Sequence, residues 1–277
     1  MAYVRTRLGR LFYEERGAQR RPGDPAIVLL HSLFFDGGMW RRQVEPLAAL
    51  GRVIVFDGPG HGKSEPAPRF MLEDHADALF DAFGELGIRR AVVVGLSWGG
   101  MVAMRLALQH PAKVAGLALL DTSAETEPLA KRVEYRSLIA LNRRVGVPYA
   151  FYRAVVAPLF FGPRTLAEHP ELVEESYRRA MGFDREGFSR AAIAVVIHRK
   201  NILASIGRIR TPTLVVCGRD DRATVLARSE AIANAVPHAK LAVIENAGHL
   251  SALENPAAVN AHLVPFVGNC VDDGSRL

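Results

Sequence analysis

The sequence has little cysteine: two residues in 277, and neither lies in a CxxC pair or in a His/Cys group with zinc-ligand spacing. Two thiols cannot build a disulfide framework, so we expect both to be reduced and buried. Long hydrophobic runs are also missing, because no stretch reaches the roughly 18 apolar residues of a membrane-spanning helix. The N-terminal region contains arginines but no apolar segment of a signal peptide. We therefore predict a cytoplasmic location and no membrane partner.

Extremes of composition are absent too. Hydrophobic residues make up 49% of the chain and charged residues 23%, which excludes a disordered or fibrous protein. The net charge of +6 raises the question of a nucleic-acid partner. However, the arginines are scattered along the chain. Pairs such as Arg143-Arg144 and Arg178-Arg179 lie near glutamates, and no nucleic-acid-binding motif accompanies them. We expect no nucleic-acid partner.

Six short apolar runs are spread along the chain. Runs without alternating polar residues are buried on both faces, which is typical of strands in a parallel sheet. An alternating segment, Tyr3–Glu15, precedes them and predicts an edge strand or hairpin. The six runs are Ala26–Leu30, Val53–Phe56, Ala91–Val94, Leu117–Leu120, Leu214–Cys217 and Leu241–Ile244.

Helical patterns separate these runs. Strands that alternate with helices form βαβ units, so we predict an α/β fold with a mostly parallel, doubly wound sheet. The expected helices are Met71–Leu86, Gly99–Gln109, Ser229–Val236 and Pro256–Phe266.

One segment, residues 124–205, interrupts this alternation. It has no convincing strand and is rich in arginine and aromatic residues, and the strand pattern resumes only at Thr213. We predict a helical insertion after the sixth strand of a core that comprises residues 1–123 and 206–277. Its expected helices are Leu129–Arg144, Pro148–Phe160, Pro170–Met181 and Phe188–Leu203.

The most specific motif is Gly95-Leu96-Ser97-Trp98-Gly99, followed by Gly100. It lies between a predicted strand and a predicted helix, which is the context of a nucleophile elbow. The glycines let strand and helix approach closely, and the serine hydroxyl is then exposed at a helix N-terminus. The alternative, a glycine-rich turn with a passive serine, is disfavoured by this context. We predict Ser97 to be a nucleophile.

A nucleophilic serine needs a histidine base, and in this kind of fold the chain order is serine, acid, histidine. His249 follows the predicted strand Leu241–Ile244 and so lies at the same sheet edge as Ser97. His238 precedes that strand, at its opposite end, and His262 lies in the middle of a helix. We therefore predict His249 to be the base.

The acid that orients the histidine is expected after the preceding strand, where Gly218 is followed by Arg219, Asp220 and Asp221. Asp221 is favoured, because the loop needs one more residue after Asp220 to turn inward. Asp220 is then a solvated carboxylate or turn cap. Asp121 is a third, weaker candidate that could equally cap the start of the insertion.

Acyl transfer also needs two N–H donors for the oxyanion. One is expected from the backbone of Trp98, directly after the nucleophile, and the other from the loop His31–Trp40.

Together these motifs resemble those of the α/β-hydrolase fold superfamily, and most closely the serine carboxylesterases and 3-oxoadipate enol-lactonase-like hydrolases. The resemblance covers nearly the whole chain. It rests on His31-Ser32-Leu33 with Met39-Trp40, Asp57–Ser64, Gly95–Gly100, Gly218–Asp221 and Gly248-His249.

The resemblance implies several roles. The family's acid falls three residues after the loop glycine, which supports Asp221. Its second oxyanion donor falls two residues after the loop histidine, which indicates Leu33. The insertion matches the family's cap domain. The family usually has glycine where this chain has Ser32, so either Ser32 is strained or the loop differs. The Leu33 donor is then less well aimed, or the Ser32 hydroxyl adds a hydrogen bond of its own.

Two more polar groups look catalytic in isolation. Asp57 and His61 belong to a segment that resembles a structural turn of the family, and the structural role is favoured. Four residues could suggest a metal, but their helical spacing is that of a solvated face, so no metal is expected. They are Asp74, His75, Asp77 and Asp81.

These residues predict a serine hydrolase that cleaves carboxylic esters or lactones through an acyl-enzyme, without a cofactor. Phe34, Phe160 and Phe161 predict an apolar substrate pocket, or equally the packing of the insertion on the core. The expected partner is a small-molecule ester or lactone, and the protein is expected to be a monomer or homodimer. The alternatives are an enol-lactonase or C–C bond hydrolase of aromatic catabolism, and a non-catalytic ligand receptor on the same fold.

Overall fold

The computed structural model, which describes residues 2–274, contains an eight-stranded sheet in the order β1-β2-β4-β3-β5-β6-β7-β8. The strands β1 and β2 form an antiparallel hairpin, β2 runs antiparallel to β4, and the other neighbours are parallel. The predicted fold class is confirmed. The strands are β1 (Ala2–Thr6), β2 (Gly9–Arg16), β3 (Ala26–Leu30), β4 (Val53–Phe56), β5 (Ala91–Leu96), β6 (Val114–Leu120), β7 (Thr213–Gly218) and β8 (Lys240–Ile244).

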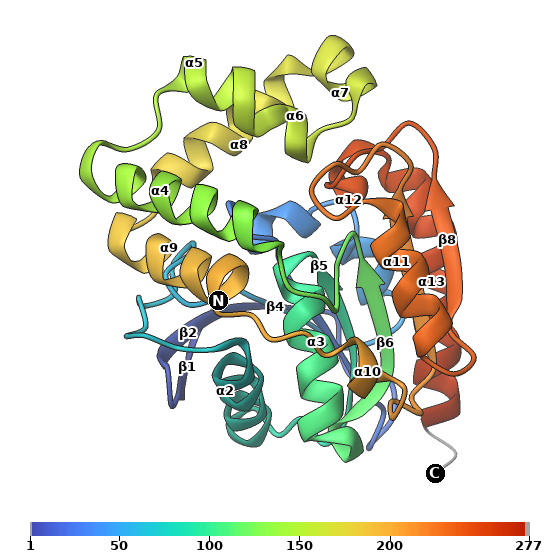
Figure 1. The fold of residues 1–277 in the computed structure, drawn as a ribbon. Helices are drawn as coiled ribbons and strands as arrows, with labels where there is room; N and C mark the ends of the chain where they lie inside the picture. Colours follow the sequence, from blue (N-terminus) through green and yellow to red (C-terminus); the bar gives the residue numbers. More distant parts are fainter. Residues whose placement is uncertain (1, 275–277) are drawn as a thin grey trace.

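Helices cover both faces of this sheet (Figure 1). In β5, Val92 and Val94 belong to one hydrophobic core and Val93 to the other, because successive residues of a strand point to opposite faces. One core is shared with α2 (Leu72–Glu85), α3 (Trp98–Gln109) and α11 (Leu226–Ala235). The other is shared with α1 (Val44–Ala48) and α13 (Pro256–Gly274).

The last helix is longer than predicted. The pattern ended at Phe266, but α13 continues to Gly274 although it contains Pro265. Leu263, Val267 and Val271 recur every fourth residue and are at most 1% exposed. This apolar stripe holds the helix on the sheet beyond the proline.

Residues 121–212, all of which the structure describes, form helices and loops but no strand. Figure 1 shows α4 to α8 gathered at one end of the molecule. Arg179 of α8 pairs with Asp36 after β3 (2.7 Å), and Gly162 N–H donates to Glu254 after β8 (2.7 Å). These helices therefore lie over the carboxyl ends of the parallel strands. The helical elements between β6 and β7 are α4 (Leu129–Val145), α5 (Tyr149–Phe151), the π-helical η3 (Tyr152–Val156), α6 (Ala157–Phe160), α7 (Pro163–Glu168), α8 (Pro170–Met181), α9 (Arg185–Ala192), the π-helical η4 (Ile193–Ile197) and α10 (Leu203–Ile206).

The prediction of a helix over Phe188–Leu203 is wrong in its second half, because this helical stretch ends at Ile197. The chain turns there to bury Arg199, which pairs with Glu127 (2.6 Å) and donates to the Glu125 carbonyl oxygen (2.7 Å). The division into a core of residues 1–123 and 206–277 and a cap of residues 124–205 stays a prediction.

Both cysteines, Cys217 and Cys270, are buried, as expected. Within residues 2–274, none of the helices has the length and hydropathy needed to cross a bilayer.

Candidate active site

The elbow that holds the candidate nucleophile lies where β5 meets α3. Ser97 has φ 53° and ψ −111°, a backbone conformation that side-chain-bearing residues rarely adopt. The close approach of strand and helix explains the flanking glycines. A Cβ on Gly99 would overlap the carbonyl oxygen of Leu30, and a Cβ on Gly95 would overlap the backbone of Gly99. The predicted strand–turn–helix context of Ser97 is therefore present.

The structure brings Ser97, His249 and Asp221 together. Ser97 Oγ lies 2.8 Å from His249 Nε2, and His249 Nδ1 lies 2.9 Å from Asp221 Oδ2. The three residues follow β5, β8 and β7, whose carboxyl ends share one edge because these strands are parallel. All three side chains are buried. His238 and His262, in contrast, are exposed.

His249 and Asp221 each stabilise the charged form of the other. Burial would raise the pKa of Asp221, but the charge and hydrogen bond of His249 and the N–H and O–H of Thr224 lower it. Burial would lower the pKa of His249, but the charge and hydrogen bond of Asp221 raise it. The hydrogen-bond network assigns the tautomer: Nδ1–H donates to Asp221, and Nε2 accepts from the Ser97 hydroxyl.

The other candidate acids make no hydrogen bond to His249 within the described chain. Asp220 is partly exposed, and its backbone N–H donates to the carbonyl oxygen of Ala247 (2.9 Å). Asp121 is fully buried and binds the N–H groups of Gly218 (2.8 Å) and Ser251 (3.2 Å). Of the three carboxylates, Asp221 alone is placed to orient the imidazole.

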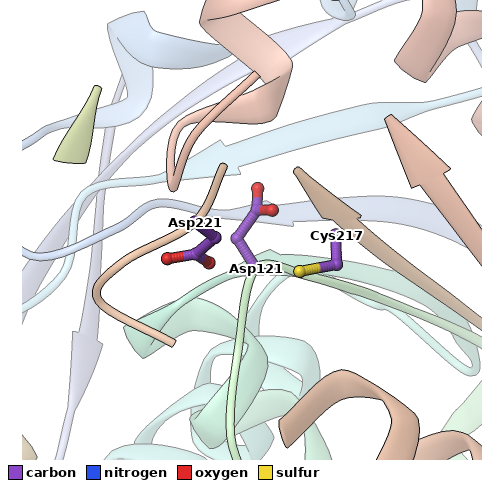
Figure 2. A group of neighbouring side chains, drawn as sticks. All are labelled: Asp121, Cys217 and Asp221. Carbon is purple, nitrogen blue, oxygen red and sulfur yellow. The ribbon is translucent and has the colours of Figure 1, made fainter. Parts of the chain in front are cut away.

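Asp121, Cys217 and Asp221 lie close together (Figure 2), each with a potential ligand atom within 4.8 Å of the others. Burial and the two carboxylates raise the pKa of the Cys217 thiol far above its ordinary value, which disfavours a thiolate ligand. Asp221 is already engaged by His249 and Thr224. The chemistry of these donors therefore does not fit a metal ion.

The loop after β3 forms a tight turn, in which Phe35 N–H donates to the Ser32 carbonyl oxygen (3.2 Å). Phe34 has φ 70°, as the third residue of a type II turn does. The left-handed conformation considered for Ser32 thus falls on Phe34 instead, because the loop differs. The Ser32 hydroxyl is buried and has no hydrogen-bond partner in the described chain, so the extra hydrogen bond considered for it is not formed there.

The predicted oxyanion donors are the N–H groups of Leu33 and Trp98. Gly99 N–H donates to the His31 carbonyl oxygen (3.1 Å), which joins the loop to the first turn of α3. Trp98 is the first residue of α3, where N–H groups have no partner inside the helix. Within residues 2–274, neither N–H is recorded in a hydrogen bond. Their role as oxyanion donors stays a prediction.

Aromatic side chains border the imidazole of His249. The ring centroid of Phe160 lies 5.4 Å from that of His249, Phe34 lies 5.2 Å from Phe160, and Phe188 lies 4.8 Å from Phe34. The sequence indicated Phe34 and Phe160 but not Phe188, because an aromatic residue in an amphipathic helix carries no positional signal. Phe161 is buried in the core that contains α13, and its contact with substrate stays a prediction.

A cavity of about 300 Å³ lies among α4, α8 and α9. Phe188 lines this cavity and also packs on Phe34, so the cavity adjoins the aromatic group beside His249. The other lining residues are mostly apolar, with Asn142 and Arg185 among the polar ones.

A partly buried carboxylate that the sequence analysis missed holds the His249 loop. Glu254 Oε1 accepts the N–H groups of Gly248 (2.9 Å) and Leu250 (3.1 Å), and Oε2 accepts that of Gly162 (2.7 Å). Both neighbours of His249 are thus tied to the insertion. The only sign of this role in the sequence is that a glutamate stands five residues after His249.

The segment from Asp57 to Ser64 is the structural turn that was predicted. Asp57 accepts the N–H groups of Gly37 and Lys63, each at 2.8 Å, and the Ser64 hydroxyl donates to the Asp57 carbonyl oxygen (2.7 Å).

The prediction of a solvated face on α2 is wrong for His75. This residue is 4% exposed, and its ring centroid lies 5.2 Å from that of Trp98. His75 falls three residues after Leu72 and four before Leu79, so it shares the buried side of the helix with them.

Comparisons with known proteins agree with this geometry. A family model described as alpha/beta hydrolase fold matches residues 25–256. The chain is 30% identical over 267 residues to "Putative carbamate hydrolase RutD" of Azorhizobium caulinodans, covering 93% of this chain and 95% of the relative. It is 28% identical to 3-oxoadipate enol-lactonase 2 of Acinetobacter baylyi, covering 88% of each. The structure of a thermophilic esterase from Thermogutta terrifontis matches with a TM-score of 0.88 at 28% identity, over 98% of both chains.

Proposed function

The chain belongs to the α/β-hydrolase fold family, and from this we propose that it is a serine hydrolase that cleaves carboxylic esters or lactones through an acyl-enzyme. The observation that supports this most is the hydrogen-bonded series Ser97 Oγ, His249 Nε2, His249 Nδ1 and Asp221 Oδ2, with separations of 2.8 and 2.9 Å. The series is buried and starts at a strained elbow.

In the first half of the proposed reaction, Ser97 Oγ attacks the acyl carbon while its proton passes to His249 Nε2. The imidazolium that forms is stabilised by Asp221, which already accepts the Nδ1 proton. The negative charge on the substrate oxygen is bound by the N–H groups of Leu33 and Trp98. Donors of this kind typically contribute about 3 kcal/mol each to the transition state.

In the second half, His249 gives its proton to the leaving oxygen as the bond between this oxygen and the acyl carbon breaks. The alcohol of an ester then departs, whereas the hydroxyl of an opened lactone stays attached to the acyl group on Ser97. A water molecule then attacks the acyl-enzyme while His249 again acts as the base. Ser97 regains its proton when the acid is released. The chemistry of these steps is complete with the side chains and N–H groups named.

The aromatic group Phe34, Phe160 and Phe188 supports an apolar acyl or alcohol portion in the substrate. The names of the relatives suggest two narrower substrates, a carbamate and 3-oxoadipate enol-lactone. Each has an acyl carbon that Ser97 could attack in the same way. We therefore propose esters and lactones as the class and treat these two compounds as members of a test panel.

The test compares hydrolysis of p-nitrophenyl acetate and butyrate by the wild type and by Ser97→Ala. We expect the variant to lose at least about 10³-fold in kcat, because the nucleophile is gone. Ser176→Ala is the matched control, since Ser176 is a buried serine of α8 that bonds to Tyr152 and not to His249. Equal rates for wild type and Ser97→Ala would refute the proposal and favour a non-catalytic receptor.

A second experiment narrows the substrate. Wild-type kcat/KM is measured on p-nitrophenyl esters of increasing acyl length, on an aryl carbamate, on 3-oxoadipate enol-lactone and on a vinylogous diketone that C–C bond hydrolases cleave. The highest kcat/KM on esters or lactones is the expected result. A preference for the diketone would transfer the function to C–C bond hydrolysis.

A further inference from the structure

The two residues that follow β6 contact all three loops of the candidate triad. Asp121 is fully buried and has φ 46°, in the left-handed region that residues other than glycine rarely occupy. Its Oδ1 accepts Gly218 N–H (2.8 Å), three residues before Asp221. Its Oδ2 accepts Ser251 N–H (3.2 Å), two residues after His249.

The nucleophile is held from the same place. Thr122 Oγ1 donates to the carbonyl oxygen of Ser97 (2.7 Å), and Ser97 N–H donates to the carbonyl oxygen of Leu120 (2.8 Å). A Cβ on Gly100 would press against the Thr122 side chain, so α3 is also in contact with this residue. The end of β6 therefore fixes Ser97 on one side and the loops of Asp221 and His249 on the other.

A buried carboxyl this close to Asp221 raises the question of its charge. The charged and titratable groups that act on Asp121 are Asp221, His249 and the Cys217 thiol, and the charge of Glu254 acts in turn on His249. One imidazole cannot neutralise two buried carboxylates. Asp221 holds the hydrogen bond to His249, and burial together with the charge of Asp221 raises the pKa of Asp121 well above its ordinary value.

The remaining contact fits a neutral acid. Asp121 Oδ2 lies 2.5 Å from Ser251 Oγ, the distance of a strong O–H···O hydrogen bond in which the carboxylic acid can donate. Oδ1 stays an acceptor for Gly218 N–H, as a carbonyl oxygen would. An asparagine amide offers an acceptor for Gly218 N–H and a donor for Ser251 Oγ, although its nitrogen cannot accept Ser251 N–H, and asparagine tolerates the left-handed region.

We propose that Asp121 and Thr122 are positioning residues of the hydrolysis, which hold the three loops of Ser97, Asp221 and His249 in register, and that Asp121 does so as a neutral carboxylic acid. This inference rests on the proposed function. Both side chains are fully buried, and each acts through a neighbouring loop. A displacement of about 1 Å between reacting groups can cost roughly a hundredfold in rate.

The first test uses Asp121→Gly, which removes the side chain but accepts the backbone conformation, and Asp121→Asn. The asparagine keeps the acceptor for Gly218 N–H and a donor for Ser251 Oγ, and loses only the longer bond from Ser251 N–H (3.2 Å). With p-nitrophenyl butyrate as substrate, we expect Asp121→Gly to lower kcat by about tenfold to a hundredfold, with little change in KM. Asp121→Asn should stay within about threefold of the wild type and keep the acid limb of its pH–rate profile. Thr122→Val should lower kcat and Thr122→Ser should restore it.

Asp24→Asn is the control, because Asp24 is a buried carboxylate that binds Arg21 N–H far along the chain from the triad loops. Thermal unfolding of every variant separates loss of folding from loss of positioning. A folded Asp121→Gly with wild-type kcat and pH profile would overturn the positioning role. An Asp121→Asn as slow as Asp121→Gly, or with an acid limb shifted to lower pH, would overturn the neutral acid.

A measurement without turnover keeps this inference separate from the proposed function. The titration of His249 is followed by NMR through its ring protons in wild type, Asp121→Asn and Asp121→Gly. We expect the wild-type titration in Asp121→Asn and a changed one in Asp121→Gly, because the loops have moved. Wild-type titration in both variants would overturn the positioning role even if the protein hydrolysed no ester.

Discussion

The two sides of Ser97 are built in opposite ways. On the His249 side, the buried polar groups are paired with one another: Asp221 with His249 and Thr224, and Asp121 with Ser251. On the Trp98 side, several buried nitrogens have no hydrogen-bond partner in the described chain. These are His61 Nε2, both ring nitrogens of His75, and Trp98 Nε1.

The pKa of histidine is shifted in opposite directions on the two sides of Ser97. Asp221 raises the pKa of His249 against the effect of burial, so this ring can take a proton during the reaction. Burial lowers the pKa of His61 well below its ordinary value and that of His75 to about 3. His61 and His75 are neutral aromatic rings packed on Trp98, with centroids 4.9 and 5.2 Å away. A partner charge, more than burial, decides which histidine is basic.

The largest effect is expected from removing the charge on the paired side. Asp221→Asn should lower kcat on p-nitrophenyl butyrate by about 10⁴-fold, because the amide would donate to Nδ1 and select the wrong tautomer. Asp220→Asn, which changes the neighbouring carboxylate, should remain within about threefold of the wild type by the same assay. Comparable losses of kcat in the two variants would show that Asp221 is not the acid that orients His249.

The next largest effect is on the pH dependence of stability, through His75 on the Trp98 side. The folded pKa of His75, about 3, lies below the ordinary 6.5, so the unfolded chain binds more protons below pH 6.5. The free energy of unfolding should therefore fall as pH drops from about 6.5 towards 3, by up to about 1.4 kcal/mol per pH unit from this group. Urea unfolding between pH 4 and 8 measures the decline. His75→Phe should flatten it and His238→Phe, at an exposed position, should not; an unchanged slope in His75→Phe contradicts the assignment.

A smaller effect is expected from a hydrogen bond that supports Asp221. The Thr224 hydroxyl donates to Asp221 Oδ2 (2.9 Å). Thr224→Val should lower kcat/KM about tenfold, because a charged acceptor loses one donor. Thr224→Ser should recover most of the loss in the same ester assay. If serine and valine were equally poor, the methyl group and not the hydroxyl would be responsible.

The smallest effect concerns the loop after β3. Arg179 pairs with Asp36 (2.7 Å) at a position where its side chain is 31% exposed. Such pairs contribute less than about 1 kcal/mol, and salt weakens them. Arg179→Gln should lower Tm by a few degrees at low salt and by less in 1 M NaCl, whereas Arg178→Gln should have no measurable effect. A salt-independent loss would indicate packing of the Arg179 stem instead.

Much of the paired side could be predicted, because its signals are local. Ser97 stands in a glycine-flanked turn between a strand and a helix, and His249 and Asp221 follow strands that end at one edge. The unpaired side could not. Whether His75 faces water or Trp98 depends on how α2 rotates against the sheet, and a histidine one position from an acidic stripe gives no warning.

The supporting residues were harder to recognise for a related reason. Asp121 was a candidate acid, since a carboxylate after a buried strand looks the same in sequence whether it orients a histidine or holds two loops. Phe188 and Glu254 lie on helices whose patterns predict only burial or exposure. Their roles depend on which loops the parallel strands bring beside them.

The sequence by itself determined the fold class and the placement of Ser97 and His249 at one edge of the sheet, because both depend on patterns within a few residues. The tertiary structure alone decided which of the three carboxylates meets His249, which residue of the loop after β3 takes the left-handed conformation, and which histidines are shielded from water. Those outcomes are set by distances between loops far apart in the chain. The distance between two side chains and their burial determine which of them carries a charge. Both quantities are defined only once the strands have come together at one edge of the sheet.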